Sequence, residues 1–151
     1  MSERLTNPFV TMEINAPVEF QEHFRRFSQT TGASSVGDLD RKPFPRMVDF
    51  WFIALCVAVK KGLKPVSFEA MQTYKAVEGP QIASPEWRAH ALKLIAIAET
   101  GNPEVVKEPR RVLEIANGLA FAGMPHVLEA LNEAPDEEVF ALSDALEKLV
   151  A

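Results

Sequence analysis

Three histidines lie within one helical turn of a carboxylate, and no other arrangement in the sequence comes closer to acid–base or metal-binding chemistry. Residues three or four apart share one side of a helix, so ordinary surface ion pairs explain this spacing. A di-iron helical bundle needs two Glu-x-x-His motifs, and none occurs; a zinc site has no usable Cys and His spacing. We therefore expect neither a metal site nor a cofactor. The pairs are Glu19 with His23, Glu86 with His90, and His126 with Glu129.

Nucleophilic chemistry has no better support. Cys56 is the single cysteine and lies inside an apolar run, where a thiol is unreactive unless a base stands beside it. The sequence has no Gly-x-Ser-x-Gly motif. Gly32 and Gly37 enclose two serines, but no Gly-Lys-Ser/Thr follows them, as a phosphate-binding loop requires. We expect no catalytic residue, and hence not an enzyme.

Basic side chains between residues 25 and 64 are the candidate nucleic-acid-binding group. Lysine and arginine bind phosphates, and such binding weakens steeply as salt rises. Lys60 and Lys61 lie in the last turn of the helix expected at 45–61, whereas the other candidates lie before or near its start, and a helix rises about 1.5 Å per residue. One continuous basic stripe is therefore not guaranteed. The candidates are Arg25, Arg26, Arg41, Lys42, Arg46, Lys60 and Lys61.

Charge is divided unevenly along the 151 residues, whose net charge is −5. Residues 1–66 carry nine basic and seven acidic residues, or +2, whereas residues 67–151 carry seven and fourteen, or −7. Such asymmetry suits a basic surface for nucleic acid and an acidic surface for a partner protein, although a mixed soluble surface is the simpler interpretation. One cysteine, no recognisable export signal and no apolar run of membrane-spanning length favour a cytoplasmic location without membrane insertion.

The chemistry-bearing residues must be positioned by an apolar helix at residues 45–61, PRMVDFWFIALCVAVKK. Pro45 suits a first helical position, and Gly62 suits a left-handed cap after Lys60 and Lys61. A helix that is apolar on all sides belongs inside a core. The remaining chain is expected to pack around it.

Other helices are predicted from periodicity, capping residues and prolines. Phe20, Phe24 and Phe27 share one face of a helix that starts at Pro17, and residues 32–44 form a loop. Residues 1–16 are an arm or an edge strand. Gly118 suggests close backbone packing or a break in its helix. Further helices are expected at 68–77, 85–99, 109–123 and 125–131, with a last one opening at Pro135.

Apolar spacing also predicts which faces point inward. The inner face of the helix at 85–99 is expected to hold Trp87, Ala91, Leu94, Ile95 and Ala98. That of the last helix is expected to hold Val139, Leu142, Leu146 and Leu149.

The fold class that follows is all-α: a compact bundle of about six to seven short helices around the central helix 45–61. We expect one helical domain at residues 17–151, preceded by the arm at 1–16. With ten phenylalanines and two tryptophans spread over short helices, some apolar surface should remain for self-association as a symmetric dimer.

Three segments together resemble a known family: RKPFPRMVDFWFIALCVAVKKGLKPV, ALKLIAIAETGNPEVV and EIANGLAFAGMPHVLEAL. They are similar to small helical accessory proteins encoded with bacterial DNA sulfur-modification (phosphorothioation) defence systems. The shared features are an alanine-rich helix after a Pro/Phe segment, a leucine/alanine helix that ends near a glycine, and an Ala-Asn-Gly helix. The resemblance implies a non-catalytic partner of larger DNA-processing machinery, and no catalytic residue carries over.

Two functions are therefore predicted. The first is an all-α adaptor whose surface, including its acidic C-terminal part, docks on another protein of a larger complex. The alternative is a nucleic-acid-binding module that uses the basic residues of positions 25–64. A homo-oligomer is compatible with either function.

Overall fold

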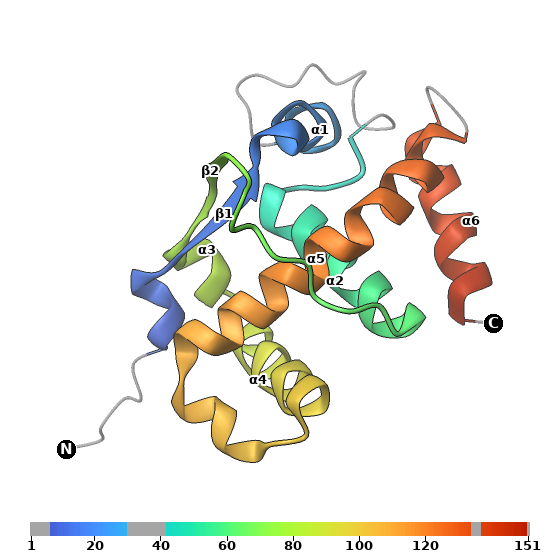
Figure 1. The fold of residues 1–151 in the computed structure, drawn as a ribbon. Helices are drawn as coiled ribbons and strands as arrows, with labels where there is room; N and C mark the ends of the chain where they lie inside the picture. Colours follow the sequence, from blue (N-terminus) through green and yellow to red (C-terminus); the bar gives the residue numbers. More distant parts are fainter. Residues whose placement is uncertain (1–6, 30–41, 134–136, 151) are drawn as a thin grey trace.

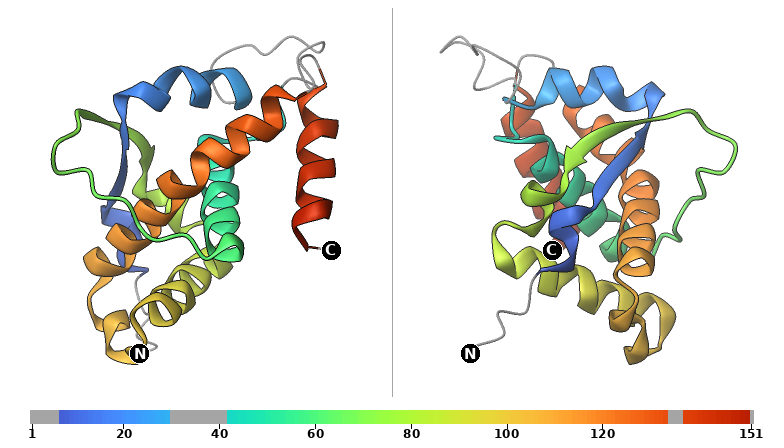
Figure 2. Two further views of the ribbon diagram at one scale, coloured as in Figure 1. Left: turned by 45° about the vertical axis from the view of Figure 1, so that its right-hand side comes forward. Right: turned by 90° about the vertical axis from the view of Figure 1, so that its left-hand side faces the viewer.

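The computed structural model describes residues 7–29, 42–133 and 137–150, and it is mainly helical with one two-stranded sheet (Figure 1). Helices α2 and α5 cross at the centre, α4 lies across one end, and α6 stands at the side of the molecule (Figures 1 and 2). The elements are η1 (Pro8–Thr11), β1 (Glu13–Pro17), η2 (Val18–Phe20), α1 (Gln21–Phe27), α2 (Met47–Lys61), β2 (Thr73–Glu78), α3 (Gly79–Ala83), α4 (Glu86–Thr100), η4 (Pro103–Lys107), α5 (Pro109–Asn132) and α6 (Glu138–Val150).

Helix α2 is the predicted central helix. It begins at Met47 rather than Pro45, because the carboxylate of Asp49 accepts a hydrogen bond from the backbone N–H of Arg46 (3.0 Å) and so caps the first turn. It ends at Gly62, whose φ of 67° is the left-handed conformation expected there. The face toward α5 is buried, including Trp51, Ala54 and Ala58.

Helix α5 packs so closely against α2 and against the segment that follows α2 that two positions accept only glycine. A Cβ atom on Gly123 would collide with the backbone carbonyl of Ala54 in α2. A Cβ on Gly118 would lie 2.8 Å from the carbonyl oxygen of Val66, whose N–H donates to the carbonyl of Gly118 at 3.1 Å. Close backbone packing at Gly118, one of the two predicted alternatives, is confirmed. We call the contact between the two helices the α2–α5 seam.

The prediction of two helices at 109–123 and 125–131 is wrong, since α5 runs unbroken from Pro109 to Asn132. Pro125 lies inside it, where a proline removes one hydrogen bond and costs about 3 kcal/mol. Buried residues flank the proline on both sides, Met124 before it and Val127 and Leu128 after it. Burial of this continuous apolar face offsets the local cost.

The predicted helix at 68–77 is also wrong. Residues 73–78 form β2, which pairs antiparallel with β1 so that Ile14 lies opposite Val77 and Ala16 opposite Tyr74. Ile14, Ala16 and Val77 are buried. Backbone pairing with a strand some sixty residues earlier in the chain therefore overrides the local pattern.

The N-terminal part packs onto this sheet and onto α2. From the arm expected at 1–16, the described residues contribute the buried Phe9 and one strand of the sheet, while residues 1–6 and most of the expected loop 32–44 lie outside the described ranges. The helix expected from Pro17 to Gly32 consists of η2 and α1 and ends at Phe27. Phe24 packs against Phe50 with ring centroids 5.2 Å apart, as predicted for a core residue.

Helix α4 has its predicted C-terminal cap at Gly101, but its inner face is rotated from the predicted one. The buried residues are Arg88, Ala89, Leu92 and Ala96, whereas Trp87 and Leu94 are 54% and 66% exposed. The helix carries apolar residues on both sides, so its periodicity alone does not select a face. The contacts of Arg88 described below decide the orientation.

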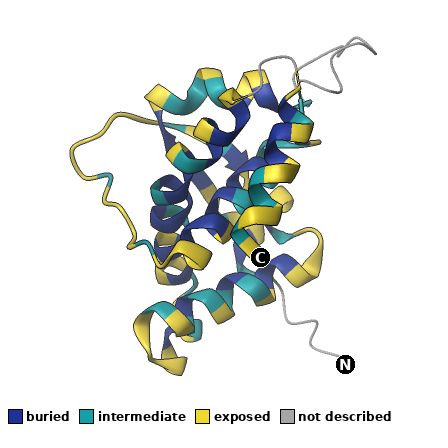
Figure 3. Ribbon diagram, turned by 90° about the vertical axis from the view of Figure 1, so that its right-hand side faces the viewer, coloured by how far each residue is buried: buried dark blue, intermediate teal, exposed yellow. Residues whose placement is uncertain are grey.

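Helix α6 contacts mainly the C-terminal half of α5 (Figure 2). Leu142 is buried as predicted, while Val139, Leu146 and Leu149 are half-buried. Figure 3, which faces the side of α6, shows exposed and intermediate residues along much of this helix. The predicted start at Pro135 lies outside the described residues. Among the helices described, none has the length and apolar character needed to cross a bilayer.

Candidate interaction surfaces

The predicted basic residues are divided between two ends of the molecule. Arg25 and Arg26 lie exposed on α1, which packs on the first turns of α2, and Arg46 immediately precedes α2. Lys60 and Lys61 lie exposed at the other end of α2, about 20 Å away at 1.5 Å per residue. The fold does not bring the set together.

Two of these basic side chains already have acidic partners. Arg26 lies 3.7 Å from Glu138, the first residue of α6, and Arg46 lies 3.5 Å from Asp49. Burial raises the pKa of the Tyr74 hydroxyl, and the nearby guanidinium of Arg25 acts to lower it. Arg26 and Arg46 therefore form ion pairs within the protein. Arg41 lies outside the described residues.

The three histidines lie on three separate elements. His23 in α1 packs near Phe20, with ring centroids 6.3 Å apart, and His90 is exposed on α4. His126 lines the same groove on α5 as Glu129. Within residues 7–29, 42–133 and 137–150, no three His, Cys, Asp or Glu side chains gather closely enough to hold a metal ion.

A buried arginine, which the sequence patterns did not identify, joins α4 to α2 and α3. Arg88 donates to the carbonyls of Gln81 (2.6 Å) and Ser84 (2.8 Å), and its other terminal nitrogen lies 3.4 Å from Asp49. Burial lowers the pKa of Arg88, and the Asp49 carboxylate opposes that shift. The group remains a cation whose partners orient α4. In the sequence, the one indication of a buried ion pair was Asp49, an acidic residue in the first turn of an otherwise apolar helix.

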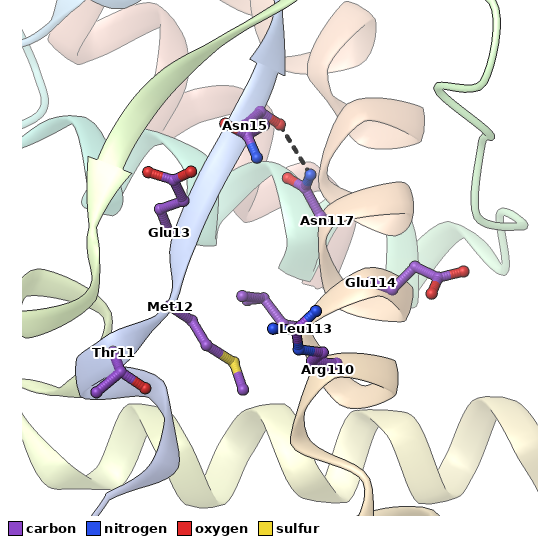
Figure 4. Close-up of a pocket in the computed structure, with 8 residues that line it drawn as sticks. All are labelled: Thr11, Met12, Glu13, Asn15, Arg110, Leu113, Glu114 and Asn117. Carbon is purple, nitrogen blue, oxygen red and sulfur yellow. Dashed lines mark hydrogen bonds between the residues drawn. The ribbon is translucent and has the colours of Figure 1, made fainter.

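A polar cleft of about 400 Å³ lies between β1 and α5 (Figure 4). At its inner end the side chain of Asn117 donates to the carbonyl of Asn15 (2.9 Å) and accepts from the indole N–H of Trp51 (2.9 Å). One amide thus connects α5, β1 and α2. Glu13 and Glu114 stand on opposite walls of the cleft (Figure 4). The amide that faces this cleft therefore has a structural role.

A second cavity, which we call the α6 groove, lies between α6, the C-terminal half of α5 and the end of α2. Its volume is about 340 Å³. The apolar part of its wall includes Val57, Val127, Leu142, Leu146 and Leu149. Its polar wall consists of Lys61, His126, Glu129, Glu133 and Lys148.

Large apolar side chains are exposed where α2 and α4 lie side by side. The rings of Phe52 and Trp87 meet edge to face with centroids 5.3 Å apart, near the start of both helices. Further along, Val59 near the end of α2 and Leu94 in the middle of α4 line a cavity of about 340 Å³. We call this surface the α2–α4 face: Phe52, Cys56 and Val59 of α2 with Trp87, Ala91, Leu94 and Ala98 of α4.

Comparison with known proteins adds no relative: no family model, no curated protein and no solved structure matches this chain. The α6 groove and the α2–α4 face are the surfaces from which an interaction is argued below.

Proposed function

We propose that this protein is a non-catalytic helical adaptor, and that the α6 groove is the site where a partner protein docks. The observation that carries the proposal is the incomplete packing of α6. Leu146 and Leu149 of α6 are only half-buried, and both line a groove whose other walls are Val57 of α2 and Val127 of α5. An apolar groove between helices is the usual receptor for an amphipathic helix of a partner.

The charge around the groove describes the partner. Five exposed carboxylates in α5 and α6 and in the residues next to these helices outnumber the two lysines that line the groove, Lys61 and Lys148. Two of the carboxylates, Glu129 and Glu133, line the groove itself. A helix with apolar residues on one face and basic residues along its edges would complement this surface. The exposed carboxylates are Glu129, Glu133, Glu137, Asp144 and Glu147.

The sequence resemblance favours one setting for such a partner. Accessory proteins of DNA sulfur-modification systems act beside larger DNA-processing components, and such components offer basic segments. We propose that the adaptor belongs to a complex of this kind, where nucleic acid is reached through the partner. Direct nucleic-acid binding is the competing function, and the separation of Arg25 and Arg46 from Lys60 and Lys61 makes it the weaker one.

The test begins with recovery of partners by the tagged full-length chain from its native host at moderate salt, with and without nuclease. The recovered protein is then purified and its binding measured directly. Leu149→Glu, which places a charge in the groove, should weaken binding at least about tenfold, equivalent to about 1.4 kcal/mol. The matched control is Val150→Glu, since Val150 is 72% exposed on the same helix and does not line the groove.

Three results would overturn the adaptor proposal. One is the absence of any protein partner that survives nuclease. Another is equal binding by the Leu149→Glu variant and the wild type, with the fold of both verified by circular dichroism. The third is binding of naked nucleic acid that weakens with salt and with neutralisation of Arg25 and Lys42.

A further inference from the structure

The outward side of α4 carries a stripe of apolar residues. Trp87, Ala91, Leu94 and Ala98 follow one another at spacings of four, three and four, so they form one stripe along the helix. Three of them are exposed and Ala91 is half-buried. The inward side holds smaller residues, Ala89 and Ala96, beside Leu92 and the charged Arg88. Apolar residues therefore lie on both sides of α4, and the outward stripe is left largely exposed.

The stripe continues onto α2, so that the exposed surface spans two helices. Phe52, Cys56 and Val59 follow at i, i+4 and i+7 on the side of α2 next to α4. Phe52 contacts Trp87, and Val59 shares a cavity wall with Leu94 and Ala98. One apolar surface thus extends over about two turns of α2 and three turns of α4.

The area of this surface suits the centre of a protein interface. Trp87, Leu94 and Val59 are 54%, 66% and 45% exposed, so the α2–α4 face offers an apolar patch of a few hundred Å², a size that marks binding surfaces on single chains. A standard interface covers about 800 Å² on each partner, and about 60% of that area is apolar. A patch of this size can therefore supply much of the apolar centre of one interface.

The face carries an exposed aromatic side chain and a cavity at different places along α4. Trp87, 54% exposed, lies near the start of the helix, and the cavity lined by Val59, Leu94 and Ala98 lies further along it. Trp87 and Ala98 are separated by about 16 Å along the helix, at 1.5 Å per residue. A twofold axis across the middle of α4 carries each Trp87 to the cavity of the other copy. The small side chains of Ala91 and Ala98 allow the two helices to approach closely.

We propose that the α2–α4 face is the interface of a homodimer in which two α4 helices pack antiparallel and each Trp87 enters the α2–α4 cavity of the second copy. An isologous interface of this kind requires a knob and its socket on the same patch of one chain. The α6 groove lies on a different side of α2, so the dimer is independent of the adaptor proposal and leaves that groove free.

The experiment measures the mass of the full-length chain by analytical ultracentrifugation from about 1 to 100 µM, a range that brackets a micromolar Kd. The wild type should be a dimer at the upper end. Leu94→Glu should raise the dimer Kd at least about 30-fold, because it buries a charge at the centre of the interface. Ala98→Arg, at a position exposed in the single chain, should have the same effect if Leu94→Glu fails to fold.

Two further measurements locate the interface. Phe140→Glu changes an exposed residue of α6 and should leave the dimer intact. Alkylation of Cys56 should slow severalfold between dilute and concentrated wild type, and it should not depend on concentration in the Leu94→Glu variant. A wild type that is monomeric at about 100 µM would overturn the proposal. So would a dimer that survives both Leu94→Glu and Ala98→Arg, or one that only Phe140→Glu disrupts.

Discussion

Helix α2 has two apolar sides that meet very different surroundings. On the α2–α5 seam, Gly123 lets two backbones come into contact, and Trp51 is fully buried. On the α2–α4 face, Trp87 is 54% exposed, and a cavity remains between the helices. Close packing supplies dispersion contacts and removes apolar area from water, whereas an open face does neither. The comparison teaches that stability is concentrated at the seam and that the periphery is free to bind.

The strongest way to break this comparison is Gly123→Ala. Helix propensity alone predicts about 1 kcal/mol of stabilisation, but the added Cβ collides with the carbonyl of Ala54 and separates the helices. We expect a loss of about 3 kcal/mol, which lowers Tm by about 6–12 °C. Ala122→Gly, at the half-buried neighbour, should cost only about 1 kcal/mol in the same thermal unfolding experiment. A stabilised Gly123→Ala variant would refute the close contact.

Next in size is the loss of the buried cation at the junction of α4 with α2. Arg88→Met leaves the carbonyls of Gln81 and Ser84 without their donors, and Asp49 without its partner. Because Asp49 is partly exposed, we expect a loss of about 2 kcal/mol rather than the larger cost of a fully buried pair. Urea unfolding measures this loss of stability, and Arg110→Met, at an exposed position, is the control. Equal midpoints for the two variants would contradict the structural role of Arg88.

Loss of the Asn117 side-chain amide, which joins α5, β1 and α2, should lower the free energy of unfolding by a smaller amount. Asn117→Ala removes the acceptor for Trp51 and the donor to Asn15, for an expected loss of about 1–2 kcal/mol. Trp51→Phe removes the buried donor itself. A double-mutant cycle in urea should therefore show that the two losses are not additive. Strict additivity would show that the Trp51–Asn117 bond contributes no coupling.

The smallest expected effect sharpens the comparison between the two tryptophans. In the Leu94→Glu background, Trp87→Phe should change the unfolding free energy by less than about 1 kcal/mol, because the exposed indole has little buried area to lose. The remaining fluorescence, from buried Trp51, should resist quenching by acrylamide. Strong quenching in the Trp87→Phe variant would show that Trp51 is accessible and that the assignment of buried and exposed tryptophans is reversed.

Local patterns predicted much of the helical architecture. The apolar run identified α2, and Gly62 and Gly101 identified the ends of α2 and α4, because only a left-handed residue completes those caps. The spacing of Phe24 and Phe27 identified core residues. Of the basic candidates, Arg25 and Arg26 share α1, and the length of the helix 45–61 already indicated that Lys60 and Lys61 lie far from Arg46.

By itself, therefore, the sequence determined where α2 and α4 form and which residues end them, since caps and apolar runs act over a few residues. Tertiary structure decided the rest. Strand β2 exists because β1 pairs with it, and α5 continues through Pro125 because its buried face is continuous. The inward face of α4 was decided by Arg88 and its partners. Each of these outcomes depends on contacts between distant residues, whose free energies outweigh the local preferences.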